Sequence, residues 1–104
     1  MLDAHLHLWQ RKPGAYTWLG PELGALDDDF PPEAAEAEIE AARVTGAVLV
    51  QADDTVEDSK YLFDTVERFD WALGVVAWLP LDLPDRSSEL LDEYVAQRSI
   101  CGVR

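Results

Sequence analysis

The chain has 104 residues, enough for one domain at most, and its 48% hydrophobic and 10% aromatic content argues against a disordered protein. The formal net charge of −13 repels phosphate backbones and anionic lipid headgroups, so we expect neither nucleic-acid nor membrane partners. A lone cysteine excludes an intrachain disulfide, and the first residues contain neither a signal peptide nor a transmembrane pattern, which together predict a cytoplasmic location.

Residues 2–9 alternate between apolar and polar side chains, a period that predicts a first β-strand. The apolar positions share one face of this strand, and His5 and His7 lie on the other. Because a polar strand face meets either solvent or a binding site, these two histidines are the first candidates for a functional role.

Residues 10–31 predict a long loop, because they contain Pro13-Gly14, Gly20-Pro21 and an acidic run at 27–29. Loops of this length are usually either functional or disordered. This one carries Tyr16, Trp18 and other apolar residues, which indicates an ordered loop packed over the rest of the domain. The acidic run itself is predicted to be a solvated turn.

The rest of the chain alternates between helical and strand patterns. Helices are predicted over residues 32–43, from Thr55 to about residue 69, and from Ser87 or Ser88 to Val95, and strands over residues 47–51, 71–79 and 100–103. Strands that alternate with helices imply parallel βαβ units. A barrel of eight such units needs about 250 residues.

The predicted fold class is therefore α/β, and the predicted architecture is the N-terminal half of a (β/α)8 TIM barrel, with about four parallel strands and three helices. Residues 1–104 would form the N-terminal part of a single barrel domain. The last predicted strand has no helix after it, so we expect an unprotected sheet edge and a fragment of a longer protein. A complete, small flavodoxin-like fold is the structural alternative.

The spacing of His5 and His7 suits a shared metal ion. Side chains at positions i and i+2 of a strand point the same way, so both imidazoles can reach one ion. They lie near the carboxyl end of the first strand, where the active sites of barrels are found. The alternative is a pair of exposed or hydrogen-bonded histidines on an edge strand.

Five stretches of the chain resemble a known family: residues 2–9, 16–19, 46–52, 74–78 and 102–104. The first of them reads Leu-Asp-Ala-His-Leu-His-Leu-Trp. Together they resemble the amidohydrolase-related (amidohydrolase 2) family of metal-dependent barrel hydrolases. Its members include sugar-acid lactonases and dicarboxylate lactone hydrolases.

The resemblance implies roles for particular residues. His5 and His7 match the metal ligands of the first strand, with zinc as the expected divalent ion, although some members work without a bound ion. Family members complete the site with two histidines and a general-base aspartate from later strands. The chain has only two histidines, so the resemblance implies no catalytic residue within residues 1–104 and an inactive fragment.

Four further residues are candidates for binding substrate. Gln51 and Arg104 match strand-end positions that face the pocket in the family, and a planar guanidinium suits a substrate carboxylate. The alternatives are an ordinary strand terminus and a surface arginine. Trp18, together with Trp9 and Tyr16, could wall the pocket or pack on the barrel rim. Trp78, at the end of the third strand, could bind substrate or belong to the core or rim.

The first functional hypothesis is a hydrolase that opens a carboxylated or sugar lactone, or a similar cyclic ester or amide, by attack of an activated water. A decarboxylase on the same scaffold is the second. The third is a non-catalytic half-barrel that covers its open edge with a copy of itself, as a homo-oligomer, or with a missing second half.

Overall fold

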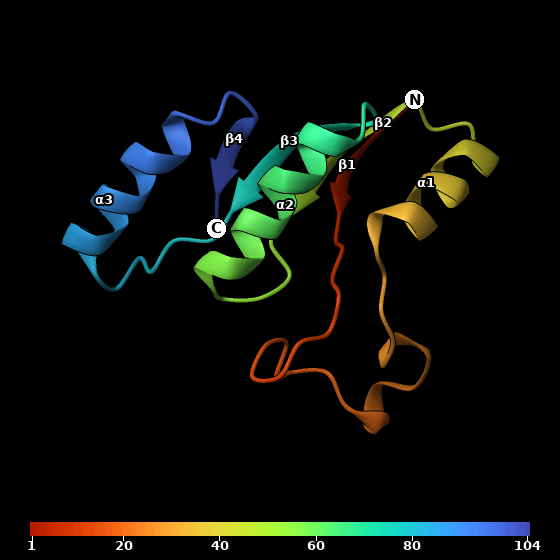
Figure 1. Ribbon diagram of the computed structural model, residues 1–104, viewed down its shortest axis with the longest axis horizontal. Helices are drawn as coiled ribbons and strands as arrows, with labels where there is room; N and C mark the ends of the chain where they lie inside the picture. Colours follow the sequence, from red (N-terminus) through yellow and green to blue (C-terminus); the bar gives the residue numbers. More distant parts are fainter.

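The computed structural model describes residues 1–104 and contains one four-stranded parallel sheet (Figure 1). Its strands are β1 (Leu2–Leu6), β2 (Gly46–Val50), β3 (Ala72–Ala77) and β4 (Ile100–Val103). They lie in the order β1-β2-β3-β4, so each strand pairs with the next one along the chain. A flavodoxin-like sheet places its first strand between the second and third. The flavodoxin-like alternative is therefore wrong, and the order is that of successive barrel units.

Three α-helices connect the strands, and a short 3-10 helix interrupts the first long connection. They are η1 (Pro21–Leu26), α1 (Pro32–Ala41), α2 (Val56–Arg68) and α3 (Pro84–Val95). The predicted number of α-helices is confirmed. Helix α3 begins at Pro84, before the predicted Ser87, because a proline suits the first helical position, where its missing N–H costs nothing. Helix η1 lies within the stretch predicted as loop, and no sequence pattern indicated it.

Helix α1 ends in a left-handed turn. Arg43 has a φ of 57°, and the N–H of Val44 donates to the carbonyl of Ile39 at 3.0 Å, while that of Arg43 donates to Glu40 at 3.1 Å. This pair of bonds is the Schellman motif, in which glycine usually holds the left-handed position. The chain reverses here with an arginine in that position, three residues before Gly46.

The core lies between one face of the sheet and the helices. Ala47, Leu49, Val75 and Ala77 alternate along β2 and β3 and are fully buried, and they pack with residues of α2 and α3. Val48 and Val76, which lie between these positions and point to the opposite face, are less buried. Both β1 and β4 are edge strands within residues 1–104, as expected for the last strand.

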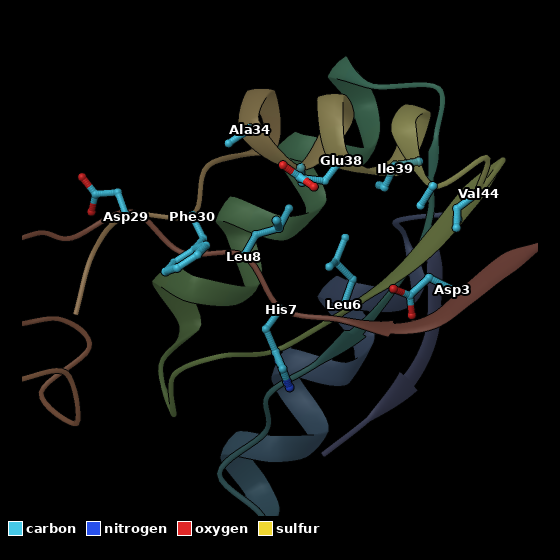
Figure 2. A pocket seen from close by; sticks show the side chains of 12 residues that line it. Asp3, Leu6, His7, Leu8, Asp29, Phe30, Ala34, Glu38, Ile39 and Val44 are labelled. Atoms are coloured by element: carbon cyan, nitrogen blue, oxygen red, sulfur yellow. The ribbon is translucent and has the colours of Figure 1, made fainter. Parts of the chain in front are cut away.

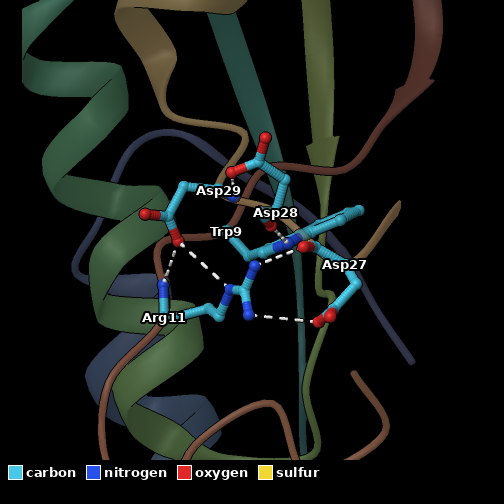
Figure 3. A network of polar contacts seen from close by, with 5 residues as sticks. All are labelled: Trp9, Arg11, Asp27, Asp28 and Asp29. Carbon is cyan, nitrogen blue, oxygen red and sulfur yellow. Dashed lines mark hydrogen bonds and ion pairs between the residues drawn. The ribbon is translucent and has the colours of Figure 1, made fainter. Parts of the chain in front are cut away.

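The long connection between β1 and α1 lies on the side to which the strand arrows point (red to orange in Figure 1). Its two ends are joined by a bridge between Trp9 and Phe30. Arg11 then contacts the acidic run: its guanidinium pairs with Asp27 at 3.1 Å, and its N–H donates to the Asp29 carboxylate at 2.8 Å (Figure 3). The acidic run is therefore not a merely solvated turn, because its carboxylates close the loop onto Arg11.

A cavity of about 520 Å³ lies between β1 and α1 (Figure 2). Leu6 and Leu8 point into it toward the helix, with Phe30 and Ile39 beside them, whereas the ring of His7 points the other way. This apolar groove therefore lies on the opposite side of β1 from the histidine pair.

No helix in the structure combines the length and apolar character that crossing a bilayer requires.

Candidate functional site

Four of the predicted site residues occupy equivalent places in the sheet. His7 follows β1, Gln51 follows β2, Trp78 follows β3 and Arg104 follows β4, each as the first residue after its strand. Because parallel strands end at the same edge of a sheet, these four positions lie on one side of the molecule. The same side receives the long loop.

A cavity of about 470 Å³ opens at this edge. It is lined by four of the predicted residues, namely His7, Gln51, Arg104 and Trp18, and by Trp9, Leu26, Ala52 and Asp54. The structure therefore brings together residues that are up to 97 positions apart (104 − 7). Its lining combines an apolar wall with a few polar groups, as small-molecule sites do.

His5 and His7 form a close pair at the edge of this cavity. Their Nε2 atoms lie 3.0 Å apart, and their rings meet edge to face. Two nitrogen ligands of one tetrahedral zinc ion, each at about 2.0–2.1 Å from it, are separated by about 3.3–3.4 Å. The observed 3.0 Å is the distance of a hydrogen bond between the two rings, about 0.3 Å shorter than the separation of two zinc ligands. A small movement of the rings would let both nitrogens bind one divalent ion.

The tautomer of His7 follows from its other nitrogen. Nδ1 lies 3.0 Å from the carbonyl oxygen of Val50, at the end of the neighbouring strand. A carbonyl only accepts hydrogen bonds, so Nδ1 carries a proton, and in the neutral ring Nε2 is then the nitrogen with the free lone pair. Such a contact orients the histidine ligands of metal sites and fixes their tautomer.

The backbone before the pair is irregular, and Asp3 supports it. The register of β1 on β2 shifts between Asp3 and Leu6, and the Asp3 carboxylate accepts a hydrogen bond from the N–H of His5 at 2.9 Å. Irregularities of this kind re-aim side chains beside active sites. Sequence reasoning did not assign this role to Asp3.

Two nitrogen ligands do not complete a metal centre. Within residues 1–104, no group of three or more His, Cys, Asp or Glu side chains lies close enough to hold an ion. A catalytic zinc site has three protein ligands as a rule. Residues 1–104 therefore do not contain a complete metal site of this kind.

Aromatic side chains form one wall of the cavity. The ring centroids of Trp9 and Trp18 lie 5.1 Å apart with the rings edge to face, and those of Trp9 and Phe30 lie 4.8 Å apart. The Trp9 indole N–H donates to the carbonyl of Asp28 at 2.7 Å, and that of Trp18 donates to Ala52 at 2.8 Å. Both indoles are therefore fixed at their polar ends and present ring carbons to the cavity.

Arg104 is a cation without a carboxylate partner. The four ion pairs of the structure involve Arg11, Arg68 and Arg86, and Arg104 takes part in none of them. Its backbone is held on both sides, by hydrogen bonds with Ala77 and Leu79. A guanidinium in this state is available to an anionic or carbonyl group of a ligand.

Two predicted residues lie outside the cavity lining. His5 contributes only through its contact with His7. Trp78 is half-buried, and its backbone N–H donates to the buried hydroxyl of Ser59 at 2.9 Å. Tyr16, from the same loop as Trp18, is also absent from the lining, because its side chain turns toward helix α2.

Sequence reasoning missed Asp54, Leu26 and Ala52 as lining residues. Asp54 directly precedes Thr55, which caps α2 with its hydroxyl accepting from the N–H of Asp58 at 3.1 Å. The position of Asp54, soon after the end of β2, could have indicated the site, since loops after parallel strands line it. Leu26 lies on η1, for which no signal was found.

Comparisons with known proteins place the chain in a family. The sequence profile of the amidohydrolase family, described as "Amidohydrolase", matches residues 2–104. An L-fucono-1,5-lactonase of Burkholderia ambifaria is 33% identical over 86% of this chain, and one of Burkholderia multivorans is 24% identical over 88%. The chain spans 31% of the length of each of these two relatives.

Two solved structures share the fold. Both are crystal structures of an amidohydrolase from Burkholderia multivorans, one with bound zinc and one with bound HEPES. Each superposes with a TM-score of 0.81 over 99% of this chain, at 26% and 25% identity, and this chain covers 36% and 35% of them. The predicted architecture, four parallel strands of a (β/α)8 barrel, is confirmed. The chain belongs to the amidohydrolase family.

Proposed function

We propose that residues 1–104 supply the first part of the active site of a metal-dependent lactonase, a hydrolase that opens a sugar lactone. The observation that carries the proposal is the convergence of the His5 and His7 Nε2 atoms beside a cavity lined by Gln51 and Arg104. Its support from outside the chain is that related proteins are L-fucono-1,5-lactonases and that a solved relative contains zinc.

The metal-binding part of the proposal assigns a divalent ion, zinc by preference, to His5 and His7. When bound, such an ion polarises a carbonyl oxygen and lowers the pKa of a water molecule that it holds. The role of the chain itself is to present two neutral imidazoles. The carbonyl of Val50 keeps the proton of His7 on Nδ1, and Asp3 holds the backbone that carries His5.

The substrate-binding part assigns three roles in the cavity. Trp18 offers an apolar ring face to the carbon skeleton of a lactone. Gln51 can donate to and accept from ring hydroxyls. Arg104 can donate two parallel hydrogen bonds to a carboxylate or a carbonyl oxygen. Arg104 also supplies a local positive charge in a chain of net charge −13, and this charge attracts the ester oxygens of the substrate.

The remaining machinery is proposed to come from polypeptide outside residues 1–104. A third metal ligand and a general base are needed, and His5 and His7 are the only histidines of the chain. The relatives are about three times as long as the chain, which leaves ample length for these groups. The complete protein, rather than these residues alone, is therefore expected to turn over substrate.

The test uses the complete reading frame that contains residues 1–104. The purified protein is assayed with L-fucono-1,5-lactone, other sugar lactones and dicarboxylate lactones, using a pH indicator to follow acid release, before and after treatment with a chelator. We expect ring opening that chelation abolishes and zinc restores. Absence of turnover on every lactone would overturn the lactonase assignment, and CO₂ release from aromatic acids would replace it with a decarboxylase. Turnover that survives complete metal removal would overturn only the metal assignment.

A further inference from the structure

Residues 16–18 of the long loop are attached to helix α2 and to the turn before it by side-chain hydrogen bonds. The hydroxyl of Tyr16 donates to the Asp58 carboxylate at 2.8 Å, and its backbone N–H donates to Asp53 at 2.9 Å. Two residues later, the indole of Trp18 donates to the carbonyl of Ala52. Three hydrogen bonds therefore fix residues 16–18 to the turn between β2 and α2 and to the first turn of α2.

Asp58 is the centre of this attachment. It occupies the first turn of α2, is only 3% exposed, and uses both carboxylate oxygens: one accepts from Tyr16, the other from the N–H of Ala52 at 2.9 Å. A carboxylate in a capping box would instead reach back to the N–H of the capping residue, here Thr55. No cation pairs with Asp58. The helix terminus thus binds the loop and the strand end through one buried side chain.

A buried carboxylate without a cation is costly for folding, and burial raises the pKa of Asp58. Tyr16 adds a second cost, because it is buried with a φ of 51°, in the left-handed region that non-glycine residues rarely adopt. Such strain persists where the surroundings over-determine the conformation, and it is concentrated at functional sites. The strained tyrosine and the buried carboxylate are the donor and the acceptor of one hydrogen bond.

The attachment controls two walls of the cavity. Ala52 directly follows Gln51, so the bond from its N–H to Asp58 sets the backbone that carries the Gln51 amide. The carbonyl of the same Ala52 holds the Trp18 indole. Asp58 and Tyr16 themselves are absent from the cavity lining. They act on it through Ala52 and Trp18.

We propose that Asp58 and Tyr16 are positioning residues for substrate, which hold Trp18 and Gln51 at the separation that a lactone ring requires. The inference rests on the proposed function of the cavity as the substrate site. Because neither residue touches the histidine pair, their loss should weaken substrate binding much more than the hydrolytic step. The effect should appear in KM and leave kcat nearly unchanged.

The experiment compares Tyr16→Phe and Asp58→Asn in the complete protein with a matched control, Tyr61→Phe. Tyr61 lies on the same helix and also buries its hydroxyl, but that hydroxyl has no hydrogen-bond partner. We expect KM for the lactone to rise on the order of tenfold in Tyr16→Phe and in Asp58→Asn, with kcat within about twofold, since a lost bond to a charged group is worth about that factor. The double variant should be no worse than Asp58→Asn alone, and Tyr61→Phe should leave KM unchanged.

A second readout does not depend on turnover. In protein labelled with 5-fluorotryptophan, the fluorine resonance of Trp18 is identified by its loss in Trp18→Phe. We expect that resonance to shift or broaden in Tyr16→Phe and to stay in place in Tyr61→Phe. If Asp58→Asn does not fold, Asp53→Ala removes only the bond to the Tyr16 N–H and should shift the resonance less, in the same direction.

The outcomes separate the two proposals. A wild-type protein without lactonase activity overturns the proposed function, and the Trp18 resonance still tests whether Tyr16 and Asp58 position that side chain. An active protein in which Tyr16→Phe changes neither KM nor the Trp18 resonance overturns the positioning role. An equal effect of Tyr61→Phe would also overturn it, because the loss of any buried hydroxyl would then suffice.

Discussion

The two halves of the candidate site are held in place by different means. His7, Gln51 and Arg104 each follow a strand. Gln51 and Arg104 donate main-chain hydrogen bonds to the neighbouring strand, and the His7 ring contacts the Val50 carbonyl. Trp18 lies in the long loop, which beyond the main-chain bridge between Trp9 and Phe30 is held by side chains. Arg11 pairs with two aspartates, and Tyr16 bonds to Asp53 and Asp58.

The difference predicts how each half responds to substitution. A strand-end residue can be replaced without moving its neighbours, because the ladder bonds come from the main chain. Its replacement should therefore remove one chemical role cleanly. A residue that attaches the loop should instead move several lining groups at once, although it contacts none of the substrate itself.

The largest expected effect comes from the strand-end histidine. His7→Ala removes one of two converging ligands, and we expect the zinc content of the complete protein to fall to a small fraction, with turnover reduced by more than about a hundredfold. Metal content is measured by atomic emission after dialysis, and turnover in the lactone assay. Full zinc occupancy in His7→Ala would contradict the assignment of this residue.

Arg104→Lys tests whether the guanidinium fork, rather than its charge, binds substrate. Lysine keeps the charge but cannot make two parallel hydrogen bonds, so we expect KM to rise about tenfold with little change in kcat. Arg98→Lys, an exposed position in the turn before β4, is the matched control and should behave as wild type. A KM for Arg104→Lys equal to that of the control would mean that this arginine does not touch substrate.

Alkaline pH should loosen the loop and the helix that holds it. Burial raises the pKa of Tyr61 to about 12, and burial together with the nearby Asp58 carboxylate also raises that of Tyr16. In the unfolded chain these tyrosines ionise near pH 10. The free energy of unfolding should thus be unaffected by them below about pH 10 and fall as pH rises toward 12, since the folded state binds the protons longer.

Urea unfolding at a series of pH values, followed by circular dichroism, measures this fall. Tyr61→Phe removes one of the contributing groups and should flatten the curve between about pH 10 and 12. A slope in that variant as steep as in wild type would show that the Tyr61 hydroxyl titrates normally in the folded protein.

The smallest expected effect comes from the contacts that join Arg11 to the acidic run at 27–29. Arg11→Gln removes ion pairs with Asp27 and Asp29 whose side chains are exposed by 21% to 47%, and such pairs contribute about 0–1 kcal/mol. We expect amide hydrogen exchange in residues 10–29 to accelerate by at most a few fold, with little change in global stability. Lys12→Gln is the control for loss of a charge at the next position. Equal acceleration in both variants would show that the contacts of Arg11 do not close the loop.

Much of the fold could be predicted because its signals are local. The alternation of residues 2–9, the apolar run before Gln51 and the helix opened by Thr55 each depend on a few neighbouring side chains. The resulting βα order implies parallel strands, and parallel strands place His7, Gln51 and Arg104 at one edge. The strand period indicated His5 and His7 as candidates, whereas the family resemblance indicated Gln51 and Arg104; neither needed knowledge of a long-range contact.

The tertiary structure decided what lies between those strand ends. Tyr16 and Asp58 are 42 residues apart, and nothing near either of them in the sequence indicates that they meet. The turn at Arg43, the short helix η1 and the burial of Asp58 likewise depend on packing and not on the preference of the residue. By itself, the sequence determined the strands and the histidine pair, because their periods are local, whereas the conformation of the loop that completes the cavity depends on hydrogen bonds that form only once the sheet has brought distant residues together.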